Sequence, residues 1–233
     1  MDTTSWIIFS DDDLLVINKP AGILSIPDGY RPDIPHLKSI LEPEFGGLWV
    51  IHRLDKDTSG ILLLARNPKA HRFMNQQFDN HHITKEYTAI TLGNPPWQQI
   101  SADYPLTVNG DRAHRTRVLP GKGKPALTDF LITQSLRGAS LLTAYLHTGY
   151  THQIRAHLSY LGYPILFDDL YTQPQLRASV DIINTQFTGF PHPLRTMLHA
   201  NRIRFTHPAS KLPVEFNAAL PGDFLTALNW LNK

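Results

Sequence analysis

A cluster of charged side chains stands directly before an apolar run in this chain. The stretch that starts at Ile51 reads IHRLDKDTSGILLLAR. Residues 61–65 are apolar without a polar face, which predicts a strand buried on both sides. Residues 57–60 carry an Asp-x-Ser-Gly turn signal, and Asp55 comes just before it. A charged loop attached to a buried strand can present a reactive carboxylate, although an ordinary polar turn between two strands has the same pattern.

A second set of reactive side chains lies in HTGYTHQIRAHL, which starts at His147. Gly149 predicts a turn at the end of a strand, and Thr151 is the expected N-cap of the helix that follows. Helical spacing places His152 and Arg155 on one face. An Arg beside a half-buried carboxylate would keep that carboxylate ionised, because the guanidinium is permanently charged and can bind both oxygens. The sequence alone does not show whether Asp55 and Arg155 meet.

Several motifs together resemble the RluA-type RNA pseudouridine synthases. The segment HRLDxxTSG followed by an apolar strand is similar to the central motif of that family. The other resemblances are NKPxG at 18–22, KxY at 85–87 and TGxTHQIR at 148–155. The resemblance extends from about Leu14 to about Phe216, nearly the whole chain.

The resemblance implies roles for three residues. Asp55 would be the catalytic carboxylate, Arg155 would pair with it, and Tyr87 would lie against the target base. Taken without the resemblance, Tyr87 reads as a strand aromatic with a hydrogen-bonded hydroxyl. The implied activity is an isomerase that converts specific uridines to pseudouridine in structured RNA.

The chemistry implied by this resemblance needs an ionised carboxylate. The bond between C1′ of the ribose and N1 of uracil must break, and the base must rejoin through C5. The electron deficiency at C1′ is similar to that in glycoside hydrolysis. Asp55 could attack C1′ or remove a proton from C2′, and the sequence does not choose between these routes. No metal or organic cofactor is required, in keeping with the absence of cysteine and of metal-ligand spacings.

The target uridine must leave its helical stack at a cost of a few kcal/mol. Arg53 would fill the gap, Ile154 would form an apolar wall for the base, and His52 would orient the loop. His152, on the face of Arg155, is also assigned to the substrate site. Contacts with RNA phosphates are expected from five basic residues, namely Lys19, Arg112, Arg115, Arg117 and Arg202.

Composition bounds the possibilities. The formal net charge of the 233 residues is only +2, but the stretches 112–124 and 192–214 are basic and contain no acid. Such one-signed patches suit a polyanion, and solvated basic loops look the same. The start of the chain has no signal-peptide pattern and no apolar run reaches membrane-spanning length. We therefore expect a cytoplasmic monomer whose partner is structured RNA, ribosomal or transfer RNA or both.

The expected fold class is α+β: the pseudouridine synthase fold, a mixed, mostly antiparallel bent sheet with peripheral helices and loops around a central cleft. We expect residues 1–233 to form a single catalytic domain without an N-terminal S4-type RNA-binding domain. Three helices are expected outside the motifs. They are a short one at Leu37–Leu41 before Pro43, one that begins at Pro68 with Asn67 as its cap, and a terminal one from Pro221 to Trp230.

The chain departs from the family pattern at two positions. Tyr150 stands where the family commonly has Arg, and Phe167 stands where it commonly has Gly before Asp168. Both positions bear on the choice of substrate more than on the chemistry.

Two other functions were considered. His82-Ile-Thr and His114-Arg-Thr both fit His-x-Thr, the paired motif of two-histidine phosphoesterases, in which the two histidines act as general acid and base. That function leaves the central motif unexplained. A non-catalytic RNA-binding protein on the same scaffold is the second alternative, and it does not require the pair of Asp55 and Arg155.

Overall fold

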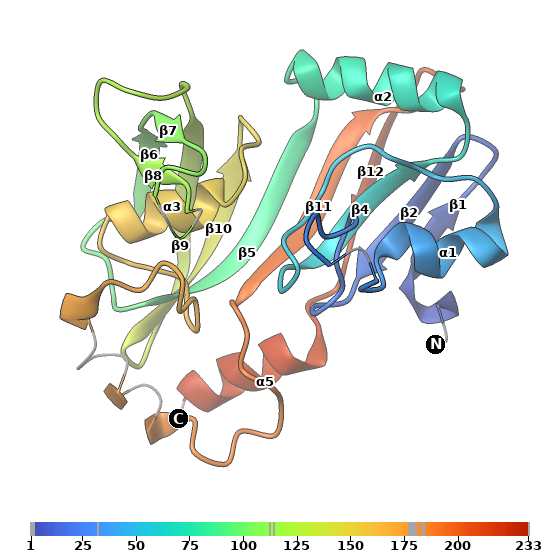
Figure 1. Cartoon of the computed structure of the whole chain (residues 1–233). Helices are drawn as coiled ribbons and strands as arrows, with labels where there is room; N and C mark the ends of the chain where they lie inside the picture. The colour runs from blue at the N-terminus through green and yellow to red at the C-terminus, as the bar shows by residue number, and fades with distance from the viewer. Residues whose placement is uncertain are drawn as a thin grey trace. The chain divides into compact units, whose positions relative to one another are not determined.

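The computed structural model describes residues 3–31, 33–111, 113, 115–176, 181–182 and 185–232. The chain divides into two compact units (Figure 1). The first unit contains Met1–Lys85 and Ala200–Ala219, and the second contains Glu86–His199 and Leu220–Lys233. No helix among the described residues is long and apolar enough to cross a membrane.

The first unit is built on a sheet with the strand order β1-β2-β4-β11, to which β12 adds on β11 and β3 adds on β4. The pairings β1–β2, β2–β4, β3–β4 and β11–β12 are antiparallel. The bounds are β1 Ile7–Ser10, β2 Leu14–Lys19, β3 Trp49–Val50, β4 Ser59–Ala65, β11 Leu198–Thr206 and β12 Pro213–Asn217.

Two helices belong to the first unit, after a short 3-10 helix at Thr4–Trp6. Helix α2 (Pro68–Asp79) begins as expected, with the Asn67 side chain accepting a hydrogen bond from Ala70 N at 2.8 Å. Its Met74 packs into a core of strand residues from β2, β4 and β11. Helix α1 (Leu37–Phe45) is longer than expected, because it continues through Pro43. Proline there removes only one intrahelical donor, so the last turn still forms.

The second unit has the strand order β5-β10-β9-β6, and its pairings are antiparallel. A separate two-stranded ribbon, β7–β8, lies above α3 in Figure 1. The bounds are β5 Thr84–Leu92, β6 Gln99–Asp103, β7 Leu106–Thr107, β8 Arg117–Val118, β9 Leu127–Leu136, β10 Ala139–Leu146, α3 Gln153–Tyr160, a 3-10 helix Pro174–Leu176 and α5 Gly222–Leu231.

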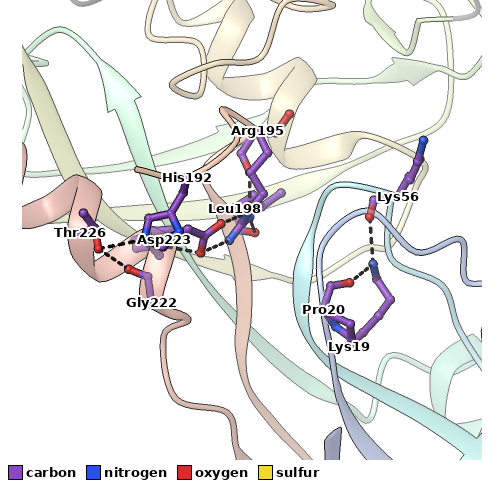
Figure 2. Close-up of polar contacts among 11 residues, drawn as sticks. Lys19, Pro20, Lys56, His192, Arg195, Leu198, Gly222, Asp223 and Thr226 are labelled. Atoms are coloured by element: carbon purple, nitrogen blue, oxygen red, sulfur yellow. Dashed lines mark hydrogen bonds and ion pairs between the residues drawn. The ribbon is translucent and has the colours of Figure 1, made fainter. Parts of the chain in front are cut away.

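A buried ion pair fixes α5 within the second unit (Figure 2). Arg195 donates from Nε to Asp223 Oδ2 at 2.6 Å and from Nη2 to Oδ1 at 3.1 Å. Its Nη1 donates to the carbonyl oxygens of Thr196 and Leu198 at 3.0 and 3.2 Å. The guanidinium lowers the pKa of Asp223, although burial opposes this. Arg195 therefore ties the first turn of α5 to the start of β11.

The predicted α+β class with mostly antiparallel strands is confirmed. Whether the two units work as the single catalytic domain expected from the sequence stays a prediction.

Candidate active site

The strand at the centre of the first unit is fully buried, as its apolar sequence predicts. All seven residues of β4 are buried. Gly60 lies opposite Lys19 of β2 and has φ +113°, a backbone conformation that only glycine adopts easily. A Cβ built on Gly60 would lie 2.2 Å from the carbonyl oxygen of Ala200 and 2.6 Å from its amide nitrogen. The glycine of the central motif therefore permits close contact between β4 and β11. This contact fixes the point at which the loop that carries Asp55 joins β4.

The main chain on both sides of Asp55 is held by the loop after β2. Ser25 Oγ donates to Leu54 O at 2.7 Å and accepts from Leu54 N at 3.1 Å. On the other side of Asp55, the carbonyl oxygen of Lys56 accepts from Gly22 N at 2.8 Å and from Lys19 Nζ at 3.0 Å. Asp55 is itself partly buried. We call this set of four hydrogen bonds the Asp55 clamp.

Lys19 has a different place from the one predicted. Its side chain is fully buried, and Nζ donates to the carbonyl oxygens of Pro20, Ile23 and Lys56 at 2.9, 2.9 and 3.0 Å. Figure 2 shows the bonds to Pro20 and Lys56. An ammonium group has three N–H donors, so these three carbonyls satisfy all of them. The prediction that Lys19 contacts an RNA phosphate is therefore wrong. Lys19 instead holds the loop that carries the Asp55 clamp.

The side chain of His52 is bound to β4 by a hydrogen bond. The β3–β4 ladder ends with Val50 opposite Leu64, and the next donor along β4, Leu63 N, is bound by His52 Nε2 at 3.1 Å. The imidazole thus replaces a strand carbonyl and joins the loop to β4. Its ring stacks on Phe78 of α2 at 5.0 Å between centroids. Lys85 Nζ lies 5.8 Å from the centre of the same Phe78 ring.

The surroundings of His52 keep its ring neutral. Burial, and then the positive charge of Lys85, lower the pKa of His52 from 6.5 to about 3. Burial also lowers the pKa of Lys85 to about 8. A neutral His52 ring with its proton on Nδ1 has an unprotonated Nε2, which is the form that accepts the hydrogen bond from Leu63 N.

Acid is expected to unfold the protein partly through His52. The unfolded chain protonates this residue below about pH 6.5 whereas the folded chain does so only near pH 3, so the stabilising contribution is present above pH 6.5 and falls as the pH drops. Between pH 7 and pH 5, the free energy of unfolding of the wild type should fall by about 1 to 2 kcal/mol more than that of His52→Gln, as measured by denaturant unfolding. The Gln side-chain oxygen still accepts from Leu63 N but does not titrate. A wild-type–variant difference that stays constant with pH would contradict this.

In the second unit, Arg155 is bound by an acid that sequence reasoning did not assign to the site. Its Nε donates to Asp168 Oδ2 at 2.6 Å and its Nη2 to Oδ1 at 2.8 Å. Both side chains are nearly inaccessible, and the guanidinium lies 4.9 Å from the centre of the Tyr171 ring. Asp168 is the first of two adjacent acids, Asp168 and Asp169, and nothing in the sequence shows that it binds Arg155. The pairing of Arg155 with Asp55 that the family resemblance implies stays a prediction.

The departure at Phe167 has a backbone consequence. Phe167 has φ +60°, the left-handed region in which glycine is favoured, so a Gly at this position would remove strain. The phenyl ring instead packs edge-on against Phe187 at 4.9 Å between centroids. Phe167 thus combines a strained backbone conformation with aromatic packing next to Asp168. Its contacts give no indication of a change in the substrate.

Helix α3 begins one residue later than expected. The N-cap is His152, not Thr151, and His152 has φ +56° and no side-chain cap bond. Its Nδ1 lies 3.1 Å from the hydroxyl of Tyr171. The first turn is fixed by Gln153, whose Oε1 accepts from Tyr150 N at 3.2 Å and from Thr148 Oγ1 at 2.8 Å. Sequence reasoning did not single out Gln153, because a lone glutamine carries no motif signal of its own.

His157 is structural, as expected. It is fully buried in α3, with Nδ1 3.0 Å from Thr128 Oγ1 and Nε2 3.1 Å from the carbonyl oxygen of Tyr104. Burial lowers its pKa, so the ring is neutral and its Nε2–H donates to that carbonyl.

The remaining predicted residues are distributed over both units. Arg53 is exposed in the loop before Asp55, and Arg202 of β11 is also accessible, 4.0 Å from Glu215. Tyr87 of β5 and Ile154 of α3 are buried, 8% and 4% exposed. Their proposed contacts with a base stay predictions.

The basic stretch 112–124 begins in the connection between β7 and β8 and includes β8. Arg115 donates from Nε to Asp111 Oδ2 at 2.7 Å, whereas Arg117 of β8 is exposed. Arg112 and His114 lie outside the described residues. His82, the other histidine of the phosphoesterase alternative, is exposed.

Removing the Ser25 hydroxyl is expected to impair catalysis through Asp55. Ser25→Ala leaves Leu54 N and Leu54 O without their buried partner, which costs about 1 to 3 kcal/mol of stability. A displaced Asp55 should lower kcat by roughly 10- to 100-fold. Steady-state kinetics should show this loss in kcat with little change in KM, and Ser25→Thr, which keeps a hydroxyl, should recover most of it. A wild-type kcat in Ser25→Ala would exclude this positioning role.

Comparison with known proteins agrees with this geometry. A solved structure of human RNA pseudouridylate synthase domain containing 1 matches with a TM-score of 0.74 and 28% identity, covering 92% of this chain and 83% of that one. The fold is thus that of the pseudouridylate synthases. The sequence model described as RNA pseudouridylate synthase matches residues 13–160.

Curated relatives give the same result. Ribosomal large subunit pseudouridine synthase D of Yersinia pestis is 35% identical over 97% of this chain and 70% of its own length. Ribosomal large subunit pseudouridine synthase C of Vibrio vulnificus is 38% identical over 92% of this chain and 65% of its own length. The chain therefore belongs to the RNA pseudouridylate synthase family, as its RluA-type motifs predict. It is an RNA-modifying isomerase, and both alternative functions are set aside.

Proposed function

We propose that this enzyme converts uridines of large-subunit ribosomal RNA to pseudouridine, with Asp55 as the catalytic carboxylate. The observation that carries the proposal is the Asp55 clamp, which fixes the main chain on both sides of the one carboxylate that the family motif singles out. The names of relatives such as the Yersinia pestis and Vibrio vulnificus enzymes support ribosomal RNA as the substrate.

The reaction is an isomerisation in which every atom of the uridine is kept. The C1′–N1 bond breaks, the detached uracil turns, C5 bonds to C1′, and the proton that leaves C5 is balanced by one gained at nitrogen. Both routes open to Asp55, attack at C1′ or removal of the C2′ proton, need its ionised form. A fixed carboxylate stabilises the electron-deficient C1′ without the cost of reorganising at the moment of reaction.

The other site residues have proposed roles around the flipped uridine. Tyr87 would stack on the base, Ile154 would support it, and Arg53, exposed beside Asp55, would fill the vacated stack. Arg155 would contribute its positive charge, held in place by Asp168. Arg115, Arg117 and Arg202 would contact phosphates.

The experiment uses unmodified transcripts. The purified chain is incubated with transcripts of large-subunit ribosomal RNA and of transfer RNAs, and pseudouridines are mapped as carbodiimide adducts that stop reverse transcription. We expect new stops at specific uridines of the ribosomal transcript. Stops only in transfer RNA would overturn the proposal that ribosomal RNA is the substrate. RNA binding without any stop would overturn the catalytic role of this chain.

We further propose that the two units act as one catalytic domain and that the enzyme is a monomer of the cytoplasm. Light scattering on the purified protein checks the monomer, and cell fractionation checks the location.

A further inference from the structure

A cavity of about 300 Å³ lies in the second unit beside α3, and neither Arg155 nor Asp168 is among its lining residues. Its walls come from β8, the last turn of α3, and residues 171–174. Figure 1 shows α3 lying below the β7–β8 ribbon, with the segment that follows Leu166 running beneath the helix. The volume is at the lower end of the range for small-molecule sites, and it suits one small ligand rather than a folded segment.

Hydrogen bonds between the walls hold the cavity open. Thr116 N donates to the hydroxyl of Tyr171 at 2.8 Å, joining the strand side to the loop side. Ser159 Oγ donates to Tyr171 O at 2.6 Å, and Gln173 Nε2 donates to Ser159 O at 2.6 Å, joining the loop to α3. A ligand would therefore enter a preformed site and lose little affinity to ordering it.

The charge of the lining is positive. Arg115 and Arg117 both line the cavity, and no lining residue is acidic. The Arg115 side chain is held by Asp111, which offsets its charge. Arg117 is exposed, and its guanidinium makes no ion pair or hydrogen bond with another residue in the described part of the chain. Its five N–H donors are available to an anion such as a phosphate.

An aromatic surface stands beside this cation. The Tyr160 side chain is 47% exposed, and its ring rests on that of Tyr104 at 4.8 Å between centroids. A half-exposed ring supported by a second ring is a platform on which a nucleobase can stack. On the floor of the cavity, Tyr171 also contacts Arg155, at 4.9 Å from the ring centre.

We infer that this cavity binds one unpaired nucleotide, with its phosphate at Arg117 and its base on Tyr160. The inference rests on the proposed function, because it identifies the ligand as a nucleotide of the RNA substrate other than the reacting uridine. Tyr171 lines the cavity and also contacts Arg155. A ligand in the cavity would therefore also restrict the motion of the Arg155 guanidinium in the candidate active site. The enzyme would thus recognise an unpaired nucleotide at a second position of its substrate.

The test compares the affinity of four variants for the ribosomal transcript, measured as Kd by filter binding with the full chain. Arg117→Gln should raise Kd about 10-fold, and Tyr160→Ser about 5-fold or more. Two matched controls should stay within 2-fold of wild type. Arg137→Gln removes an exposed charge from the β9–β10 turn of the same unit, and Tyr160→Phe keeps the ring.

Each outcome decides the inference. Equal Kd values for all four variants would overturn it. A loss with Arg117→Gln but not with Tyr160→Ser would also overturn it, because it would show a cationic surface without base stacking. A parallel calorimetric titration with uridine 5′-monophosphate distinguishes a free mononucleotide from a nucleotide of the RNA as the ligand. Binding of the mononucleotide that is lost in Tyr160→Ser, with RNA affinity unchanged, would overturn RNA as the source of the nucleotide.

The result is independent of catalysis. If no pseudouridine forms but Kd responds as expected, the proposed function fails and the cavity inference stands. If pseudouridine forms and Kd does not respond, only the cavity inference fails.

Discussion

Asp55→Asn is expected to abolish pseudouridine formation, by roughly 10⁴-fold or more, while the protein stays folded and binds RNA. The amide has the shape of the carboxylate but can neither attack C1′ nor remove the C2′ proton. Both routes open to Asp55 are therefore lost. None of the four bonds of the Asp55 clamp uses the Asp55 side chain, because they end on main-chain atoms of Leu54 and Lys56, and the variant leaves them intact. Carbodiimide mapping of the ribosomal transcript measures the loss.

The matched control for this experiment is Asp57→Asn. Asp57 is an exposed carboxylate in the same loop, so its replacement makes the same chemical change two residues away. It should alter the rate by no more than a few-fold. Equal losses in the two variants would mean that the charge of the loop as a whole matters, and residual activity near wild type in Asp55→Asn would refute the role of Asp55. Unfolding curves of both variants check that each protein is folded at the temperature of the assay.

Local signals in the sequence predicted the elements that carry the site. The apolar run after the charged loop is fully buried β4, and Asn67 with Pro68 starts α2 as the capping rule requires. These predictions depend on neighbouring residues only, so a sequence contains the necessary information. The same is true of the family, because its motifs are dense and in order.

The errors came from contacts between distant segments. A lysine at the exit of a strand is normally solvated, and only the packing of residues 20–23 and 56 around Lys19 buries its ammonium against three carbonyls. The role of Ser25 has the same origin, since its partner Leu54 is 29 residues away along the chain. The Asp168 partner of Arg155 is nearer, 13 residues away. Even so, the sequence does not indicate which basic side chain an acidic residue in a loop will bind.

Gly60→Ala is expected to destabilise the first unit by about 2 to 5 kcal/mol. A methyl group on this residue would lie 2.2 Å from the Ala200 carbonyl oxygen, and the atoms it meets are main chain and cannot rotate away. Separating β4 from β11 to make room costs about 1 to 3 kcal/mol, as overpacking generally does. The positive φ adds about 1 to 2 kcal/mol for a residue with a Cβ. Denaturant unfolding of the purified protein measures the sum.

Gly46→Ala isolates the steric part of this effect. Gly46 follows α1 in the same unit with φ +75°, and a Cβ there meets nothing within 4 Å. It therefore carries backbone strain without the clash, and should cost only about 1 to 3 kcal/mol. If the two variants lose the same free energy, the contact between Gly60 and Ala200 is not what requires the glycine. A much larger loss in Gly60→Ala, with lower activity per folded molecule, would show that this contact also positions the loop before β4.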